Sequence, residues 1–167
     1  MHVPFSFHLI RKQVRRLPTA SSRRGQSLVE FALTVPLFLL LVFGVLDFGR
    51  LFFTQMTVQH AVRQAGRFAV TGRHLTDGQG TPLTRVNSIK QVVQQSAPSI
   101  QSGDIQISSV NGGTGSAGGP SDTMTISVTY RLQIITPLVA PFFPNGEYAF
   151  TARTTFKNEP FPPELTN

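Results

Sequence analysis

The sequence predicts an α+β protein in which a long N-terminal transmembrane α-helix extends into a small head of one helix and a roughly three-stranded antiparallel sheet. Three observations support this fold class. An uncharged apolar run covers residues 31–46, apolar residues then continue at helical spacing to about residue 71, and three later segments alternate with a period of two. A chain of 167 residues has room for one compact domain and an appendage.

The positive charge of the chain is concentrated before residue 25. The formal net charge is +7, and residues 1–24 carry six basic residues and no acid. The remaining residues have nine Lys and Arg against eight Asp and Glu, so they are nearly neutral. We therefore interpret residues 1–25 as a basic cytoplasmic leader, and we expect no nucleic-acid partner. The six basic residues are Arg11, Lys12, Arg15, Arg16, Arg23 and Arg24.

The apolar run predicts a membrane span at about residues 28–48. Its 16 uncharged residues would cover about 24 Å as a helix, and Leu28, Val29 and Phe48 bring it to the ~30 Å of a bilayer core. The basic leader places the N-terminus in the cytoplasm and the C-terminus outside it. No small-x-small cleavage motif follows the run, so we expect the span to stay in the mature, single-pass protein.

Helical spacing continues past the membrane, which predicts one long helix over residues 26–72. Pro36 lacks a backbone donor and predicts a kink. Gly72 is expected to end the helix. The apolar stripe that would face the head is Leu51, Val58, Val62, Ala65 and Ala69, and the opposite polar ridge is His60, Arg63 and Arg67.

Residues 73–167 are predicted to form the head. A short helix is expected to be capped by Thr81, with Pro82 in its first turn and an apolar face ending near Ala97. Alternating residues predict strands at 105–108, 124–134 and 148–156. In the third strand, Phe150 and Ala152 would share one face, and Thr151 and Arg153 the other. Three strands with one apolar face can pack against a helix.

Nothing in the sequence indicates an enzyme, a cofactor or a metal site. The chain has no cysteine, and its four histidines show no metal-ligand spacing. A G-x-G-x-x-G pattern occurs at Gly113, Gly115 and Gly118, but another predicted strand follows it instead of the helix that phosphate binding needs. We interpret residues 111–120 as a hairpin loop.

Glu30 is the residue that most needs an explanation, because it stands at the edge of the apolar run. A carboxylate at membrane depth costs several kcal/mol and normally implies a partner. The alternative is a capping box, in which Ser27 and Glu30 satisfy backbone amides at the start of the helix.

The segment from Arg23 to Phe31, with its basic residues, glycine and glutamate before an apolar helix, resembles the processing site of type IV pilin precursors. The longer run GQSLVEFALTVPLFLLLVFGVLDFGR is similar to the N-terminal region of the TadE-like family, minor pseudopilins of tight-adherence (Flp, type IVb) pilus systems. The resemblance implies that prepilin peptidase cuts after Gly25, leaving Gln26 as the N-terminus. It also implies that Glu30 pairs with the N-terminal amine of a neighbouring subunit.

The resemblance therefore implies a structural minor pseudopilin in a bacterial inner membrane, with its head in the periplasm. Its partners would be prepilin peptidase, other pilin and pseudopilin subunits and the inner-membrane assembly platform. Whether the protein enters the extracellular filament or stays basal is left open. One alternative is an unprocessed single-pass adaptor that anchors its head beside a secretion complex. Another is a major pilus subunit, although those of the Flp class are much shorter.

Overall fold

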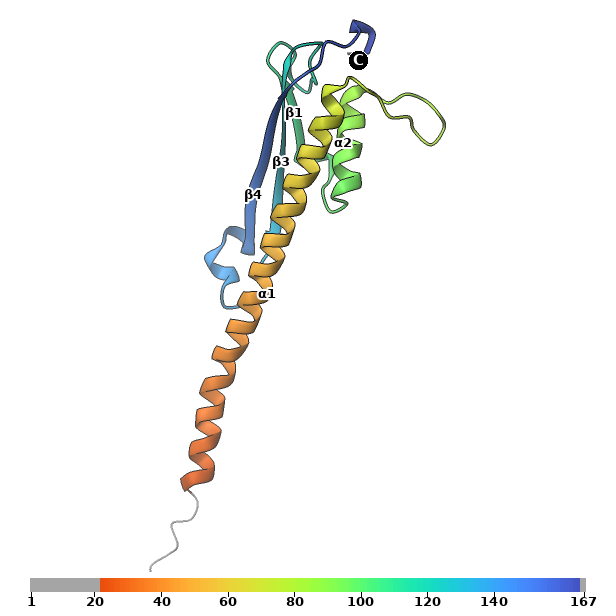
Figure 1. Ribbon diagram of the computed structural model, residues 1–167. Coiled ribbons are helices and arrows are strands. Elements are labelled where there is room, and N and C mark those ends of the chain that lie inside the picture. The colour runs from red at the N-terminus through yellow and green to blue at the C-terminus, as the bar shows by residue number, and fades with distance from the viewer. Residues whose placement is uncertain (1–21, 166–167) are drawn as a thin grey trace, which may run out of the picture. The chain divides into compact units, whose positions relative to one another are not determined.

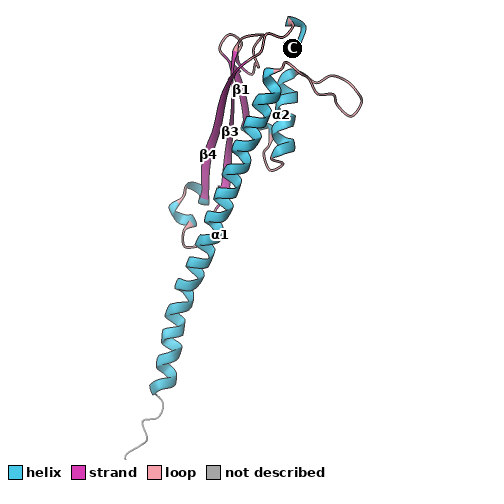
Figure 2. Cartoon of the chain, in the orientation of Figure 1, coloured by secondary structure: helices cyan, strands magenta, loops and turns pink. Residues whose placement is uncertain are grey.

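The computed structural model describes residues 22–165, and it confirms the α+β class (Figures 1 and 2). The chain divides into two compact units, Met1–Leu39 and Leu40–Asn167. Helix α1, Ser22–Val70, contributes to both units. The other regular elements all belong to the second unit, which contains the head.

The first unit consists, in its described part, of the N-terminal turns of α1. The helix already includes Ser22, because Arg23 and Arg24 are good helix formers, so the predicted start near Gln26 is wrong. Ser27 lies inside the helix, and the capping box proposed for Ser27 and Glu30 is therefore wrong in the full chain. The helix continues on both sides of Pro36, and the kink there stays a prediction.

The second unit is built around one face of α1. Four of the five residues in the predicted stripe, Val58, Val62, Ala65 and Ala69, are fully buried, while Leu51 is half-buried. The polar ridge of His60, Arg63 and Arg67 is exposed, as predicted. The helix ends where predicted, because Gly72 has a positive φ of 71° and donates its N–H to the carbonyl of Ala69.

The sheet has four antiparallel strands in the order β2-β1-β3-β4. These are β1 Ile105–Ser109, β2 Gly113–Thr114, β3 Thr123–Gln133 and β4 Glu147–Lys157. The three long strands confirm the alternating segments, and β3 pairs with β4 over its whole length. Strand β2 is an addition to the predicted three, since two residues are too few to show a periodic pattern.

One face of the sheet packs against α1, and the second helix lies beside α1 (Figure 2). The buried residues of β3 are Met124, Ile126, Val128 and Leu132. The intervening residues form the polar outer face, where Thr125 meets Thr155 and Thr129 meets Thr151 through their hydroxyl groups at 3.0 and 3.1 Å. The buried side of the sheet and the buried stripe of α1 therefore make one core.

Helix α2 spans Arg85–Ser96, and its cap differs from the prediction. Thr84 is the N-cap, and its Oγ1 accepts the N–H of Asn87 at 3.3 Å. Thr81 instead donates its N–H to Asp77 in a preceding turn, and Pro82 forms a bridge with Thr76. The carboxylate of Asp77 thus holds the chain in a turn at the position where the sequence predicts the helix to begin.

Arg85 connects three parts of the head. The Nη2 group of its guanidinium donates a hydrogen bond to the carbonyl of Ala69 at 2.8 Å, and Nη1 donates to the carbonyl of Gly118. The guanidinium also lies 4.6 Å from the ring centre of Phe161. Burial lowers the pKa of Arg85 below its usual value, while the negative charge of Asp122 opposes that shift. Arg85 therefore gives a second donor to the carbonyl of Ala69 at the C-terminal end of α1 and holds the loop after β2 and the C-terminal segment against it.

Gly66 sets the distance between α1 and β4. A Cβ atom at Gly66 would overlap the side chain of Phe156, a half-buried residue of β4. Glycine normally weakens a helix by about 1 kcal/mol relative to alanine, so its presence here is explained by this close approach.

We expect Gly66→Ala to destabilise the head by about 1–3 kcal/mol, because overlap with Phe156 outweighs the gain in helix propensity. Chemical denaturation of the detergent-solubilised chain, followed by circular dichroism, measures this change. Gly49→Ala is the matched control, since no heavy atom lies within 4 Å of a Cβ at that position. Equal stability of the two variants would contradict the packing argument.

Candidate functional site

The predicted processing and assembly residues lie together at the start of α1. Gly25 is exposed, and a Cβ there would meet no heavy atom within 4 Å. Gln26 donates its Nε2 to Oε1 of Glu30 at 3.0 Å, one helical turn away. Thr34 in turn donates its hydroxyl to the backbone carbonyl of Glu30 at 2.8 Å. The carboxylate of Glu30 is therefore exposed on the helix surface and held by Gln26.

Large apolar side chains cover the helix after Glu30 and are exposed. An 18-residue window of α1 has a mean hydropathy of 2.4, and none of it is buried. Such a surface needs a nonaqueous neighbour. α1 is long and apolar enough to cross a membrane, which is compatible with single-pass anchoring. Its exposed apolar residues include Leu28, Phe31, Leu33, Leu37, Phe38, Leu41 and Leu46.

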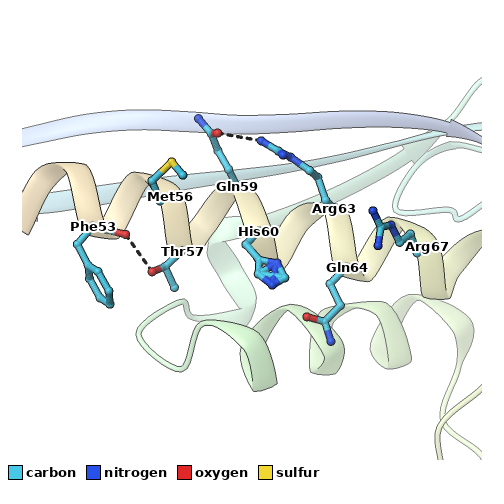
Figure 3. Close-up of a pocket in the computed structure, with 8 residues that line it drawn as sticks. All are labelled: Phe53, Met56, Thr57, Gln59, His60, Arg63, Gln64 and Arg67. Carbon is cyan, nitrogen blue, oxygen red and sulfur yellow. Dashed lines mark hydrogen bonds between the residues drawn. The ribbon is translucent and has the colours of Figure 1, made fainter.

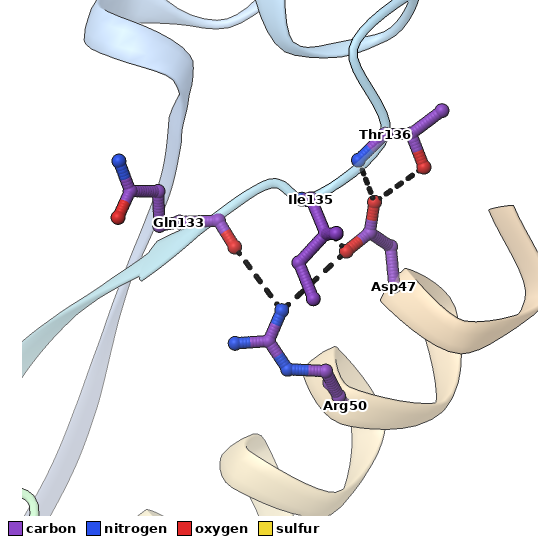
Figure 4. A network of polar contacts seen from close by, with 5 residues as sticks. All are labelled: Asp47, Arg50, Gln133, Ile135 and Thr136. Atoms are coloured by element: carbon purple, nitrogen blue, oxygen red, sulfur yellow. Dashed lines mark hydrogen bonds and ion pairs between the residues drawn. The ribbon is translucent and has the colours of Figure 1, made fainter. Parts of the chain in front are cut away.

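Asp47 is the first charged residue after the apolar run, and it is buried with 8% of its surface exposed (Figure 4). Oδ1 accepts the backbone N–H of Ile135 at 3.0 Å, and Oδ2 accepts the N–H and the hydroxyl of Thr136 at 2.8 and 2.6 Å. Arg50 lies one turn further along α1, with Nη1 3.6 Å from Oδ1, and it donates to the carbonyl of Gln133 at 3.4 Å. These contacts attach α1 to the segment that follows β3.

Residue spacing alone does not predict this role for Asp47. Its partners lie 88 and 89 positions away in the chain, and two of the three bonds use backbone donors, which any residue type offers. The available signal was the position of an acid directly after an apolar run with an arginine three residues later. That signal indicates an exposed ion pair equally well, so it could not have identified the buried contact.

A groove of about 820 Å³ runs along the exposed side of α1 within the head (Figure 3). Apolar side chains, including Phe53 and Met56, line one end, and the polar ridge lines the rest. Arg63 donates to the side chain of Gln59 at 3.1 Å, and Gln64 accepts from Ser96 of α2 at 3.0 Å. The groove is lined by positive charge from Arg63 and Arg67 and by no acidic side chain.

Within residues 22–165, no three His, Cys, Asp or Glu side chains come together as candidate metal ligands. The glycine pattern lies in the hairpin region: Gly113 belongs to β2, and the carbonyl of Gly118 accepts from Arg85. The next regular element after this region is strand β3.

Comparison with known proteins supports the resemblance found in the sequence. Residues 25–67 match the family model described as TadE-like protein. The match begins at the glycine of the predicted processing site and covers α1 through Asp47 and most of the buried stripe. This family is a structural one related to tight-adherence pili. No curated protein and no solved structure matches the chain significantly.

We expect Asp47→Ala to destabilise the head by about 2–3 kcal/mol, because it leaves the buried donors of Ile135 and Thr136 without their acceptor. Hydrogen exchange of residues 134–146 and denaturant unfolding measure the loss. Arg50→Ala is the control and should cost less than about 1 kcal/mol, since Arg50 is 44% exposed and its ion pair is long. The interpretation would be overturned if Arg50→Ala were as damaging as Asp47→Ala.

Proposed function

We propose that this protein, which carries a TadE-like segment, is a minor pseudopilin of a tight-adherence (Flp, type IVb) pilus. It would be made as a precursor, cut by prepilin peptidase after Gly25, and used as a structural subunit in pilus assembly. The observation that supports this proposal best is Glu30, an exposed carboxylate that begins an otherwise apolar and exposed helix surface.

The geometry around Gly25 suits a protease substrate. Gly25 is exposed, and the space around its Cα is empty, so a protease can approach the backbone closely. The cut would remove all six basic residues before Gly25 and leave a chain of 142 residues that begins at Gln26. The basic residues that hold the N-terminus at the cytoplasmic face would then be gone.

Cutting also changes the electrostatic surroundings of Glu30. Arg23 and Arg24 leave with the leader, and the next basic residue along the chain is Arg50, about 30 Å away along a helix. The new amine of Gln26 is then the nearest cation to this part of the helix. Because the side chain of Gln26 already binds Oε1 of Glu30, we propose that the amine of one subunit pairs with Glu30 of the next.

Such a pair would determine the register in which neighbouring helices stack more than it would stabilise the stack. Two unit charges 4 Å apart attract by about 4 kcal/mol at an effective dielectric constant near 20. Removing both charges from water offsets much of this gain. An unpaired carboxylate in an apolar surface is nevertheless costly, so stacking registers that leave Glu30 unpaired are disfavoured.

The proposed role implies a protein of a bacterial inner membrane, with the N-terminus cytoplasmic and the head periplasmic. The basic leader and the exposed apolar surface of α1 support this orientation. Other pilin and pseudopilin subunits and the assembly platform would be its partners.

We expect Gly25→Val to keep the leader attached, because the added side chain obstructs approach to the scissile backbone. Mass spectrometry of the membrane-extracted protein reads the N-terminus directly. Gly44→Val provides the control, since it changes an equally open helix position away from the cut. Wild-type protein beginning at Gln26 supports the proposal. Wild-type protein that retains Arg23 and Arg24 beside an active peptidase favours an unprocessed adaptor.

We expect Glu30→Ala to leave membrane insertion intact and to reduce piliation at least tenfold, because the amine of the neighbouring subunit loses its partner. Membrane fractionation and counts of sheared pili measure the two effects. Thr34→Val is the matched control: it removes the hydroxyl that contacts the Glu30 carbonyl but keeps the carboxylate. Normal piliation by Glu30→Ala would contradict the pairing.

A further inference from the structure

The loop between β3 and β4, residues 134–146, is an apolar surface that the pseudopilin role alone does not explain. We call it the base loop. It contains no Asp, Glu, Lys or Arg, although charged residues stand near both ends at Arg131 and Glu147. Three of its large side chains are exposed: Ile135 by 50%, Leu138 by 61% and Phe142 by 85%. An exposed phenylalanine in an uncharged loop needs an apolar environment.

The base loop is fixed beside the end of the apolar run of α1. Asp47 accepts the N–H groups of Ile135 and Thr136, and the apolar run ends at Leu46. Figure 1 shows the loop at the level of this part of α1, at the end of the sheet opposite the C-terminus. Val45, Leu46 and Phe48 of α1 are also exposed there. Exposed apolar side chains therefore occur both on the loop and on the part of α1 to which Asp47 attaches it.

The backbone of the base loop is prepared for an environment without water. Three of its 13 residues are proline and have no N–H, and eight of the other ten donate to acceptors in the head. Unpaired backbone donors are what keep most loops in water. The eight donors belong to Ile134, Ile135, Thr136, Val139, Ala140, Phe142, Phe143 and Gly146.

We infer that the base loop inserts into the interfacial region of the bilayer that α1 crosses, on the side of the head. Leu138 and Phe142 lie among the upper parts of the acyl chains, and Arg50 and Arg131, both exposed, lie level with the lipid phosphates. Tyr148, at the start of β4, contacts Phe143 of the loop with ring centres 6.3 Å apart, and tyrosine favours this interface. The inference rests on the membrane anchoring of α1 and not on processing or pilus assembly.

Insertion of the loop gives the head a second attachment to the membrane. A single span leaves a domain free to rotate about the helix axis and to tilt. A second apolar contact beside the helix restricts the head to one orientation against the bilayer. The exposed side of α1 within the head is then presented to other membrane components in a defined direction.

The absence of tryptophan from the chain allows a direct test with single-tryptophan variants. Phe142→Trp probes the loop, Leu37→Trp reports insertion of α1, and Val110→Trp is the matched control. Val110 is 75% exposed, and its N–H donates to Thr123 at the far end of β3, about 35 Å from the loop. Each full-length variant is reconstituted into phosphatidylcholine and phosphatidylglycerol vesicles with or without brominated acyl chains.

We expect bromine to quench the fluorescence of Leu37→Trp and Phe142→Trp at least twofold and to leave Val110→Trp unchanged. Quenching at Leu37 without quenching at Phe142 overturns the inference, and so does a blue-shifted but unquenched Phe142→Trp, which would show that protein covers the loop. No quenching at Leu37 overturns the anchoring itself and this inference with it. Cleavage at Gly25 is unaffected by any of these results and is tested separately.

Discussion

The hydrogen bonds that Asp47 accepts from residues 135 and 136 determine where the head begins along α1. Before Asp47, the helix exposes large apolar side chains, while within the head its buried face consists mainly of Ala, Val and Gly. Small residues let the sheet approach the helix axis, as Gly66 does beneath Phe156. Large exposed apolar side chains continue past Asp47 as far as Met56, whereas the face that the sheet covers has small side chains from Val58 onward.

The charges of the chain also differ between the part of α1 before Asp47 and the head. The basic residues of the leader precede Gly25, the apolar run is uncharged, and the exposed arginines on α1 begin at Arg50. Within the head, Arg85 is the exception, since its buried guanidinium is held by the carbonyls of Ala69 and Gly118 and by the ring of Phe161. That arginine holds the end of the head near the C-terminus of α1, and Asp47 holds the opposite end. Both are buried charges whose hydrogen bonds go largely to backbone groups, although the buried Nε of Arg85 has no acceptor among the described residues.

Features with a local periodic signal could be predicted from the sequence. The long helix, the buried stripe from Val58 to Ala69 and the three long strands all follow from spacing. Features decided by tertiary contacts could not. The sequence predicts Thr81 as the cap, whereas the turn held by Asp77 moves the start of the helix to Thr84. The contact of Asp47 with residues 135 and 136 joins segments that are far apart in the chain and leaves no periodic trace.

Glu30 and Asp47 show how one type of side chain can have opposite roles at the two ends of an apolar run. They are 17 positions apart, about 26 Å along a helix and close to the thickness of a bilayer core. The carboxylate of Asp47 accepts three hydrogen bonds from its own chain, two of them from backbone N–H groups, so it needs no partner from another subunit. Among the described residues, Glu30 accepts a hydrogen bond from the exposed side chain of Gln26, and its carboxylate lies on the helix surface. The buried carboxylate of Asp47 therefore anchors the fold, whereas the exposed carboxylate of Glu30 is the one for which we propose a contact between subunits.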